Sequence, residues 1–498
     1  MSNQPSTELE FFPHLTESQL TDLKKFWEAL NGLLYTPAQA NQADGKATKT
    51  KAEPTVPERV KNLVGESEAE RLATELWAWI MMDDPDMMVL KYIRAKKFKS
   101  TADSLELLIN SLKFRADRKL STIYYENPSI LKQLKTAKAF VFGFDKSGSP
   151  IFRVNAAKHK TSDQTPRELE DFILYSMEVT RLFVVPPAET VTMLIDLSGF
   201  GMSNMDWKCA SFMISTLESY YPETLNHQII HNAPWIFQGI WKAISTMIDP
   251  VVRSKVLFTS KNEDLIKLVD KRNLFKAEGG ESSFEWTIPA NYPVGTSVPP
   301  ANTDPAEVEK AKQAERRVHL DLTPEQERAK ISELNVRATL VARFISLTQL
   351  WLSASEDQTS APERLVKILA LRQLLKLILR AQYLKMTPLI VPNTIYHYRG
   401  ILKGEEPGTI DFEAEGASSR TNGGQDAQAG QPAIMGQEYA RPSLLKTIEH
   451  ETSRFRSTYP PSSSSLPDAT TDPSPAHENP EQVDPIDQIF TEITRLEF

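Results

Sequence analysis

The chain has 498 residues, of which 40% are hydrophobic and 33 are proline, and its formal net charge is −8. This length predicts two to four domains, and the long polar stretches predict that part of the chain is not compact. Residues 401–498 hold 17 acidic against 7 basic residues, which leaves the remainder near neutral and excludes a basic field suited to nucleic acid. The single cysteine, Cys209, excludes an internal disulfide and a cysteine-based metal site, and it favours a reducing compartment.

No targeting segment is predicted. The first residues, MSNQPSTELEFF, contain neither the basic region nor the apolar core of a secretory signal. No uninterrupted apolar run reaches the roughly 18 residues that a membrane-spanning helix needs. We therefore expect a cytoplasmic chain without a transmembrane helix.

Helices dominate the predicted structure of the first part of the chain. Thr16 and Gln19 form a capping-box pattern, and apolar residues at helical spacing follow, which predicts an N-terminal helix within residues 1–35. Residues 36–66 are rich in Ala, Asn, Gln, Lys, Thr and Pro, a composition typical of a flexible linker. Three further helical patterns predict a helical subdomain over residues 67–135.

The apolar spacing changes from helix to strand at Ala139. Phe140, Phe142 and Phe144 alternate with other residues before a turn, which predicts a β-hairpin. Later apolar runs predict more strands, and helical patterns separate them; these runs are Thr190–Leu197, His227–His231 and Val256–Thr259. This alternation predicts an α/β domain over residues 136–288, with a mixed or mostly parallel sheet flanked by helices.

The segment from Trp235 to Ile248 has large apolar side chains around nearly the whole circumference of a helix. Such a helix must be buried in protein, in a ligand cavity or in lipid. At about 15 residues it is too short to span a bilayer. The pattern alone leaves a buried core helix and a helix over a ligand cavity as alternatives.

The last third of the chain is predicted to contain a proline-rich linker over residues 289–322, an appended helical region over 323–400 and a disordered acidic tail over 401–498. A helix that ends near Lys385 combines an apolar side with the basic residues Arg364, Lys367, Arg372, Lys376 and Arg380. This pattern predicts either a membrane-binding or partner-binding surface, or an extra helical hairpin that packs on the predicted α/β domain and has a solvated basic edge. The last dozen residues have the apolar spacing of a short helix that docks back.

The candidate catalytic and cofactor-binding motifs in the sequence are incomplete. Gly199-Phe200-Gly201 follows a predicted strand, but the third glycine of a dinucleotide-binding loop is replaced by Asn204. His227 and His231 have no carboxylate or cysteine at zinc-ligand spacing nearby. We therefore predict a protein that is not an enzyme, with no catalytic residue, no metal and no cofactor.

Several motifs occur in order and resemble a known family. YPE, HNAPWIF and IDPVVRSKVLFTS follow one another between Tyr221 and Ser260, and LKYIRAKKF precedes them at Leu90–Phe98. Together they resemble the CRAL-TRIO lipid-binding family, the group of the yeast phosphatidylinositol/phosphatidylcholine transfer protein. The resemblance covers about Asp84 to Trp286. It implies a helical N-terminal subdomain, a lipid-binding α/β domain, and a gate over the lipid cavity formed by the helix near Pro234–Met247.

The resemblance also implies a headgroup site. The family binds the phosphatidylinositol headgroup with a glutamate in the YPE turn and a lysine after the D-P-V turn, which match Glu223 and Lys255. Its basic pair matches Lys96 and Lys97, and the acid before its hinge-like proline matches Asp249. The family often has arginine at the first position of the basic pair, and a lysine there lacks the bidentate fork.

The resemblance makes some apolar residues candidates for the cavity or its gate, with ordinary core packing as the alternative for each. They are Val191, Met193, Ile195, Phe212, Trp235, Phe237, Ile240, Trp241 and Ile244. Members of the family that bind phosphatidylcholine carry small hydroxyl residues where this chain has Val191 and Met193. This difference argues against choline-headgroup binding and leaves inositol-lipid binding intact.

The expected function is binding phosphatidylinositol, together with a second hydrophobic lipid, and exchanging it between membranes. The alternatives are a carrier of a neutral ligand such as a sterol or squalene, and a lipid-sensing scaffold that does not transfer lipid. We expect a monomer that contacts membranes transiently, binds no nucleic acid and recruits protein partners through its tails. The target membrane, whether endosome, Golgi, endoplasmic reticulum or lipid droplet, is left open.

Overall fold

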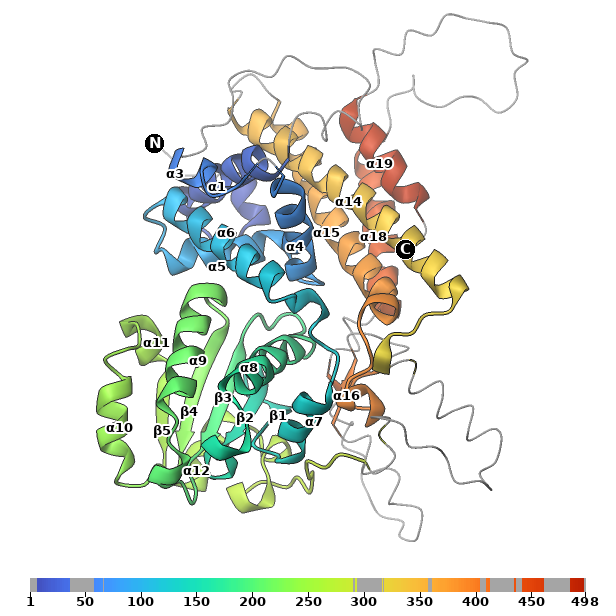
Figure 1. Ribbon diagram of the computed structural model, residues 1–498. Coiled ribbons are helices and arrows are strands. Elements are labelled where there is room, and N and C mark those ends of the chain that lie inside the picture. Colours follow the sequence, from blue (N-terminus) through green and yellow to red (C-terminus); the bar gives the residue numbers. More distant parts are fainter. Residues whose placement is uncertain are drawn as a thin grey trace, which may run out of the picture. The chain divides into compact units, whose positions relative to one another are not determined.

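The computed structural model describes most of the chain and divides it into two compact units (Figure 1). The described residues are 7–35, 58–65, 67–289, 292, 316, 318–356, 361–403, 409–412, 434–435, 441–460 and 484–496. The helical unit comprises Met1–Glu106, Arg328–Met386 and Arg441–Phe498. The sheet unit comprises Leu107–Glu327 and Thr387–Ala440.

The sheet unit is built on five strands in the spatial order β1-β2-β3-β4-β5. They are β1 (Ala139–Phe144), β2 (Pro150–Asn155), β3 (Val191–Asp196), β4 (Leu225–His231) and β5 (Val256–Thr259). β1 and β2 are antiparallel, and every later pair is parallel. The predicted mixed α/β sheet is therefore confirmed.

Short polar residues form the turn of the β1–β2 hairpin. The Asp145 carboxylate accepts hydrogen bonds from the backbone amides of Ser147 and Ser149, at 2.9 and 3.0 Å. Gly148 has a φ of +84°, a conformation that glycine adopts without the penalty of a side chain. This local chemistry explains why the hairpin could be predicted from sequence.

The helices of the sheet unit are α7 (Pro128–Lys135), α8 (Pro166–Arg181), α9 (Trp207–Tyr220), α10 (Phe237–Ile244), α11 (Pro250–Ser254), α12 (Asn262–Leu268) and α16 (Ile395–Tyr398), and α6 (Thr101–Asp117) leads into it. Its 3-10 helices are Leu120–Thr122, Ala156–Lys158, Thr161–Asp163, Met202–Asn204, Lys271–Asn273 and Lys276–Glu278. Two short strands, β6 (Ile410–Asp411) and β7 (Ile434–Met435), pair antiparallel. Figure 1 shows α10 and α11 beside β5, at the end of the sheet away from β1.

The two faces of the sheet are buried to different extents. On one face, Ile151, Leu194 and Ile229 are 0%, 1% and 1% exposed and pack against α12 and the segment after it. On the other face, Leu197 and Ile230 form a buried cluster with Phe237 and Ile240 of α10, and the apolar side chains packed against this cluster are only partly buried. This second face is called the open face below; it carries the candidate site.

The helical unit contains η1 (Thr7–Phe11), α1 (Glu17–Leu34), α3 (Glu58–Lys61), α4 (Ala69–Ile80), α5 (Pro85–Ala95), most of α14 (Pro324–Glu356) and α15 (Pro362–Ile390), α18 (Arg441–Thr458) and α19 (Pro485–Arg495). The predicted capping box starts α1, because Thr16 and Gln19 exchange both hydrogen bonds. Part of the predicted appended region is thus one body with the N-terminal helices. The rest of it, from Thr387, belongs to the sheet unit, where Tyr396 accepts a hydrogen bond from the Val141 amide at 2.7 Å.

The basic side of α15 is partly buried. For Arg372 and Lys376 this burial decides between a membrane-binding or partner-binding surface and a packed helix. Arg372 is 0% exposed, and its Nη2 donates to a carboxylate oxygen of Asp86 in α5 at 2.6 Å. Lys376 forms an ion pair with the same carboxylate. The indole of Trp27 donates to Asp86 at 2.8 Å. A carboxylate buried with two cations and a further donor holds three helices together. Arg372 and Lys376 therefore belong to the packed interior of the helical unit and not to a membrane surface.

The predicted disordered tail over 401–498 is wrong at α18 and α19. The apolar residues of α19 are buried, and they are Ile486, Ile489, Phe490 and Ile493. Asp484 caps this helix, Asp487 pairs with Lys367 at 2.6 Å, and Glu492 pairs with Arg343 at 2.5 Å. Acidic composition suggested disorder, but here the acids meet the basic residues of α14 and α15. The predicted docking of the last dozen residues is confirmed; residues 413–433 and 461–483 lie outside the described residues.

Candidate functional site

Glu223 and Lys255 form the polar end of the candidate site. Glu223 lies two residues before β4 and Lys255 directly precedes β5, so parallel pairing brings both to the same edge of the sheet. Lys255 Nζ lies 3.4 Å from Glu223 Oε2 and donates to the Leu225 carbonyl oxygen at 2.8 Å. The two side chains are 24% and 31% exposed. The structure therefore brings together the two predicted headgroup residues, although 32 positions separate them.

The pair retains hydrogen-bonding capacity. A lysine ammonium has three donors and a carboxylate has two acceptor oxygens. Among the described residues, Glu223 accepts no hydrogen bond apart from the one from Lys255. Partial exposure also weakens the attraction between the two charges, because water screens them. Such a pair can exchange part of its mutual contact for contacts to a polar ligand.

A buried ion pair supports the turn that carries Glu223. Glu178 of α8 is 0% exposed, accepts two hydrogen bonds from Arg115 at 2.8 and 3.0 Å, and accepts a third from the Tyr221 hydroxyl at 2.6 Å. Burial alone would raise the pKa of Glu178, but Arg115 holds it below its ordinary value. Glu223 itself has a φ of +53°, which residues other than glycine seldom adopt. The network thus fixes Tyr221, which lies two residues before the unusual backbone conformation of Glu223.

Asp249 has a structural task ahead of Lys255. Its carboxylate caps α11 by accepting from the Val251 amide at 2.7 Å, and its own amide donates to Glu218 at 2.9 Å. Pro250 at the first position of α11 suits a helix start. Asp249 therefore orients the helix that directly precedes Lys255, and a direct contact between Asp249 and a headgroup stays a prediction.

The open face is apolar and only half-buried. One row of in-register residues runs across it as Phe152, Met193, Gln228 and Val256. The next row consists of Val154, Ile195, Ile230 and Phe258. Met193 is 9% exposed and Phe258 50%, and Val191, Ile195 and Val256 are half-buried. Central strands normally bury both faces of a parallel sheet. The contrast with the opposite face indicates that side chains alone do not fully cover this one.

The helices over the open face are also incompletely buried. In α9 the large apolar residues Phe212, Met213, Ile214 and Leu217 are all half-buried, and Thr216 is its one buried residue. In α10, Phe237 and Ile240 are 8% and 5% exposed, whereas Trp241 and Ile244 are half-buried. Trp241 meets Phe258 of β5 edge-on, with ring centroids 5.2 Å apart. A few side chains thus hold α10 to the sheet.

The prediction that the whole segment from Trp235 to Ile248 is buried is wrong. Trp235 is 82% exposed and Met247 is 43% exposed. The reason is that α10 starts at Phe237 and ends at Ile244, so neither residue lies on a continuous helix that could turn it inward. Two large exposed apolar side chains thus flank the two ends of α10.

The chain shows clear similarity to known proteins at this site. The family model for the CRAL/TRIO domain matches residues 134–280, which include all five strands and the Glu223–Lys255 pair. Phosphatidylinositol transfer protein CSR1 of Eremothecium gossypii is 31% identical over 373 residues, which cover 72% of this chain and 79% of that protein. The chain belongs to the CRAL-TRIO family.

Two further proteins share shorter stretches with the chain. A CRAL-TRIO domain-containing protein of Schizosaccharomyces pombe is 34% identical over 263 residues, which cover 51% of this chain and 59% of that protein. The crystal structure of Sfh5 is 16% identical, and the match covers 55% of this chain and 94% of that one with a TM-score of 0.37. The chain thus spans 59% to 79% of the length of these two curated relatives.

The basic pair of the CRAL-TRIO resemblance lies in the helical unit. Lys96 caps the end of α5 and is half-buried, and Lys97 is exposed with a φ of +55°. Their contact with a headgroup at Glu223 and Lys255 stays a prediction.

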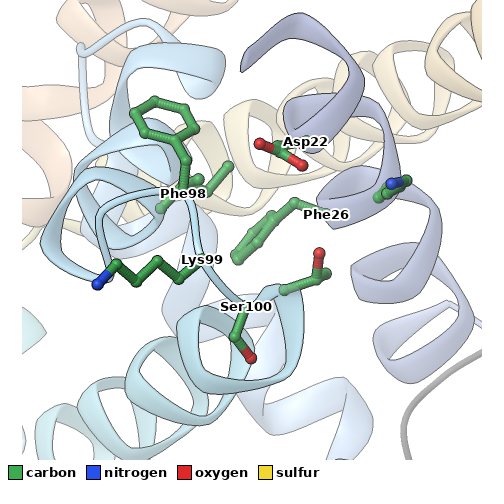
Figure 2. A pocket seen from close by; sticks show the side chains of 8 residues that line it. Asp22, Phe26, Phe98, Lys99 and Ser100 are labelled. Carbon is green, nitrogen blue, oxygen red and sulfur yellow. The ribbon is translucent and has the colours of Figure 1, made fainter. Parts of the chain in front are cut away.

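A small polar pocket lies next to this basic pair. It has a volume of about 140 Å³ and is lined by Asp22, Lys25, Phe26, Ile93, Phe98, Lys99, Ser100 and Thr101. Figure 2 shows that Lys99 extends its amine away from the other labelled side chains. Sites for drug-sized ligands usually measure about 300–1,000 Å³. The pocket is therefore too small for the acyl chains of a lipid.

Sequence reasoning missed two features of the CRAL-TRIO site. The first is the Arg115–Glu178–Tyr221 network. A charged residue on an amphipathic helix is normally expected to face solvent, and the sequence does not show a buried partner that lies far away along the chain. The second is Gln228, a polar residue within the apolar face of β4. Its polarity within an otherwise apolar alternating pattern is a signal that could have identified it.

The described residues were also considered as possible metal ligands and as possible membrane-spanning helices. They contain no group of three or more His, Cys, Asp or Glu side chains placed to hold a metal ion. None of the helices within the described part of the chain combines the length and the apolar character needed to cross a membrane.

Proposed function

We propose that this protein binds phosphatidylinositol, with the acyl chains against the open face and the headgroup at Glu223 and Lys255, and that it exchanges this lipid between membranes. One observation carries the proposal: a half-solvated pair of opposite charges ends an apolar sheet face that side chains cover incompletely. The name of the Eremothecium relative, a phosphatidylinositol transfer protein, supports the choice of lipid. Exchange needs no covalent step.

The apolar face and the charged pair of the site match the acyl chains and the headgroup of a phospholipid. Each methylene group removed from water contributes about 0.8 kcal/mol to the free energy of binding. Burial of the acyl chains against the open face would therefore stabilise the complex substantially. The ammonium of Lys255 attracts the phosphate, and Glu223 accepts hydrogen bonds from inositol hydroxyls. Lys96 and Lys97 add positive charge to the same headgroup in this proposal, and Asp249 orients the helix before Lys255.

Release of the lipid requires an element that can move, and α10 suits this role. It spans eight residues, and only Phe237 and Ile240 are buried in it. Elements with few buried contacts open at low free-energy cost. Exposed Trp235 and Met247 flank the helix, and a bilayer would bury both when α10 opens. In this proposal the protein associates with membranes peripherally and transiently.

Lipid identification and a transfer assay test the proposal. Mass spectrometry of lipids that copurify with the wild type should find phosphatidylinositol, and Lys255→Ala should lose most of it. Lys271→Ala is the matched control, because it removes an exposed lysine side chain that makes no hydrogen bond or ion pair to the described residues. Equal recovery of inositol lipid from wild type and Lys255→Ala would remove Lys255 from the site.

A carrier of a neutral hydrophobic ligand is the second candidate, favoured by the existing contact between Lys255 and Glu223. Because the charges of Lys255 and Glu223 already neutralise each other, the pair does not require a ligand phosphate as its counter-ion. Copurified lipid without phosphorus would support this candidate. A lipid-sensing scaffold would bind lipid without accelerating its movement between vesicles. A second hydrophobic ligand on the open face also belongs to the proposal, and lipid identification tests it.

A further inference from the structure

Gln228 is a polar side chain on the open face. It lies in register between Met193 of β3 and Val256 of β5, and residues paired in register share one face of a sheet. Ile230, two positions further along β4, belongs to the apolar cluster with Phe237 and Ile240. Gln228 is thus the one polar residue in a row whose other members, Phe152, Met193 and Val256, are apolar, and it is half-buried.

The side chain of Gln228 has unused hydrogen-bonding groups. Its backbone amide donates to the Lys255 carbonyl oxygen at 3.0 Å, so its place in the sheet is secure. Its side-chain amide makes no hydrogen bond to any of the residues that the structure describes. An amide covered by an apolar ligand loses its water and must find a new partner or raise the free energy of the complex. A pure hydrocarbon against this face would leave the amide unpaired.

The position of Gln228 relates it to the polar end of the site. It is three residues along β4 from Leu225, whose carbonyl holds the Lys255 ammonium, a distance of roughly 10 Å along an extended strand. It also pairs with Val256, the residue directly after Lys255. In a glycerophospholipid with its phosphate at Lys255, the next polar atoms are the two ester carbonyls, one glycerol unit further toward the chains.

We propose that Gln228 donates a hydrogen bond to an ester carbonyl of the bound glycerolipid and makes the site select for ester-linked lipid. This inference rests on the proposed function and adds a specificity residue to it. The carboxamide is suited to this role because its NH₂ group donates without carrying a charge. Apolar neighbours in the same row, Met193 and Val256, cannot supply such a donor.

A competition between two lipids tests the inference. Vesicles of phosphatidylcholine would contain equal amounts of diester phosphatidylinositol and its diether analogue with the same chain length, which lacks both carbonyl oxygens. The ratio of the two lipids bound to protein would be measured by mass spectrometry. Wild type should prefer the diester by about tenfold, the effect of one hydrogen bond to an otherwise unpaired group. Gln228→Leu should bind both equally.

The matched control is Met193→Leu, which changes the neighbouring position in the same row without removing a hydrogen-bonding group. It should keep the wild-type ratio whatever its effect on the total amount bound. The ratio does not depend on the fraction of folded protein. A diester preference that persists in Gln228→Leu would overturn the inference.

Other outcomes separate this inference from the function on which it rests. Equal binding of diester and diether by the wild type would overturn the role of Gln228 and leave lipid binding intact. Binding of neither lipid would overturn the proposed function and this inference with it. Thermal unfolding without lipid is a second measurement: Gln228→Leu should not lower the midpoint, because the unliganded amide stabilises nothing.

Discussion

Arg115 and Glu178 form a bidentate ion pair, at 2.8 and 3.0 Å, in which the side chains are 1% and 0% exposed. The pair lies behind the Tyr221-Pro222-Glu223 turn and bonds it through the Tyr221 hydroxyl. Removing Arg115 takes from Glu178 the two hydrogen bonds of its nearest cation and leaves only the longer contact with Arg181, at 3.8 Å. The conformation of the proposed headgroup site therefore depends on residues that do not face the headgroup.

Arg115→Met should destabilise the sheet unit by about 3–5 kcal/mol, because Glu178 would stay buried without its principal partner. Urea unfolding followed by tryptophan fluorescence measures the effect. The double variant Arg115→Met, Glu178→Leu should recover a large part of the loss, since the fully buried carboxylate is then removed together with its principal partner. A single variant as stable as the wild type would show that the ion pair does not support the turn.

Glu126 should make stability depend on pH. Burial raises the pKa of this carboxyl to about 7, although the hydroxyls of Tyr175 and Tyr292 and the Ile395 amide donate to it. A folded-state pKa above the unfolded value means that the folded protein binds more protons between pH 4.5 and 7. Stability should therefore fall by about 3 kcal/mol as pH rises through this window, and stay level above it.

Urea unfolding of the wild type and Glu126→Gln at several pH values checks this dependence. The amide cannot ionise and still offers an oxygen to the Ile395 amide, so the variant should lose this part of the pH slope. Its difference from the wild type should be smallest at the acid end of the window. Identical slopes for both proteins would rule out Glu126 as the titrating group.

Trp235→Ala should weaken binding to vesicles by about tenfold, because the bilayer would no longer bury a large aromatic side chain. Its effect on stability should be small, since Trp235 is 82% exposed. Vesicle sedimentation measures the binding. Ile331→Ala is the control: it removes an apolar side chain that is 57% exposed on α14, a helix that is not part of the proposed gate. Equal loss in both variants would contradict a specific role of Trp235.

Lys367→Glu should loosen α19, because it reverses one charge of the Lys367–Asp487 pair, whose side chains are only 15% and 11% exposed. We expect a cost of about 1–3 kcal/mol in the docking of α19, seen as faster amide hydrogen exchange within Pro485–Arg495. The double variant Lys367→Glu, Asp487→Lys should restore part of the protection. Unchanged exchange in the single variant would show that the apolar residues of α19 suffice.

Some parts of the fold follow from local sequence patterns. The Thr16 capping box, the Asp145–Gly148 turn and the apolar strand runs each depend on residues close in sequence, and each was predicted. The YPE and D-P-V motifs indicated Glu223 and Lys255 before any contact was known. Tail disorder was predicted wrongly for α18 and α19, because composition cannot reveal that Asp487 will find Lys367, 120 residues earlier.

By itself, the sequence of this protein determined the order of its helices and strands, its family resemblance and the identity of the two charged residues at the proposed headgroup site. Only the tertiary structure decided that Trp235 is exposed, that one face of the sheet is half-buried, and that Arg372 is interior. The physical reason is that periodicity and capping are properties of neighbouring residues. Burial and ion pairing depend instead on which distant segments pack against them.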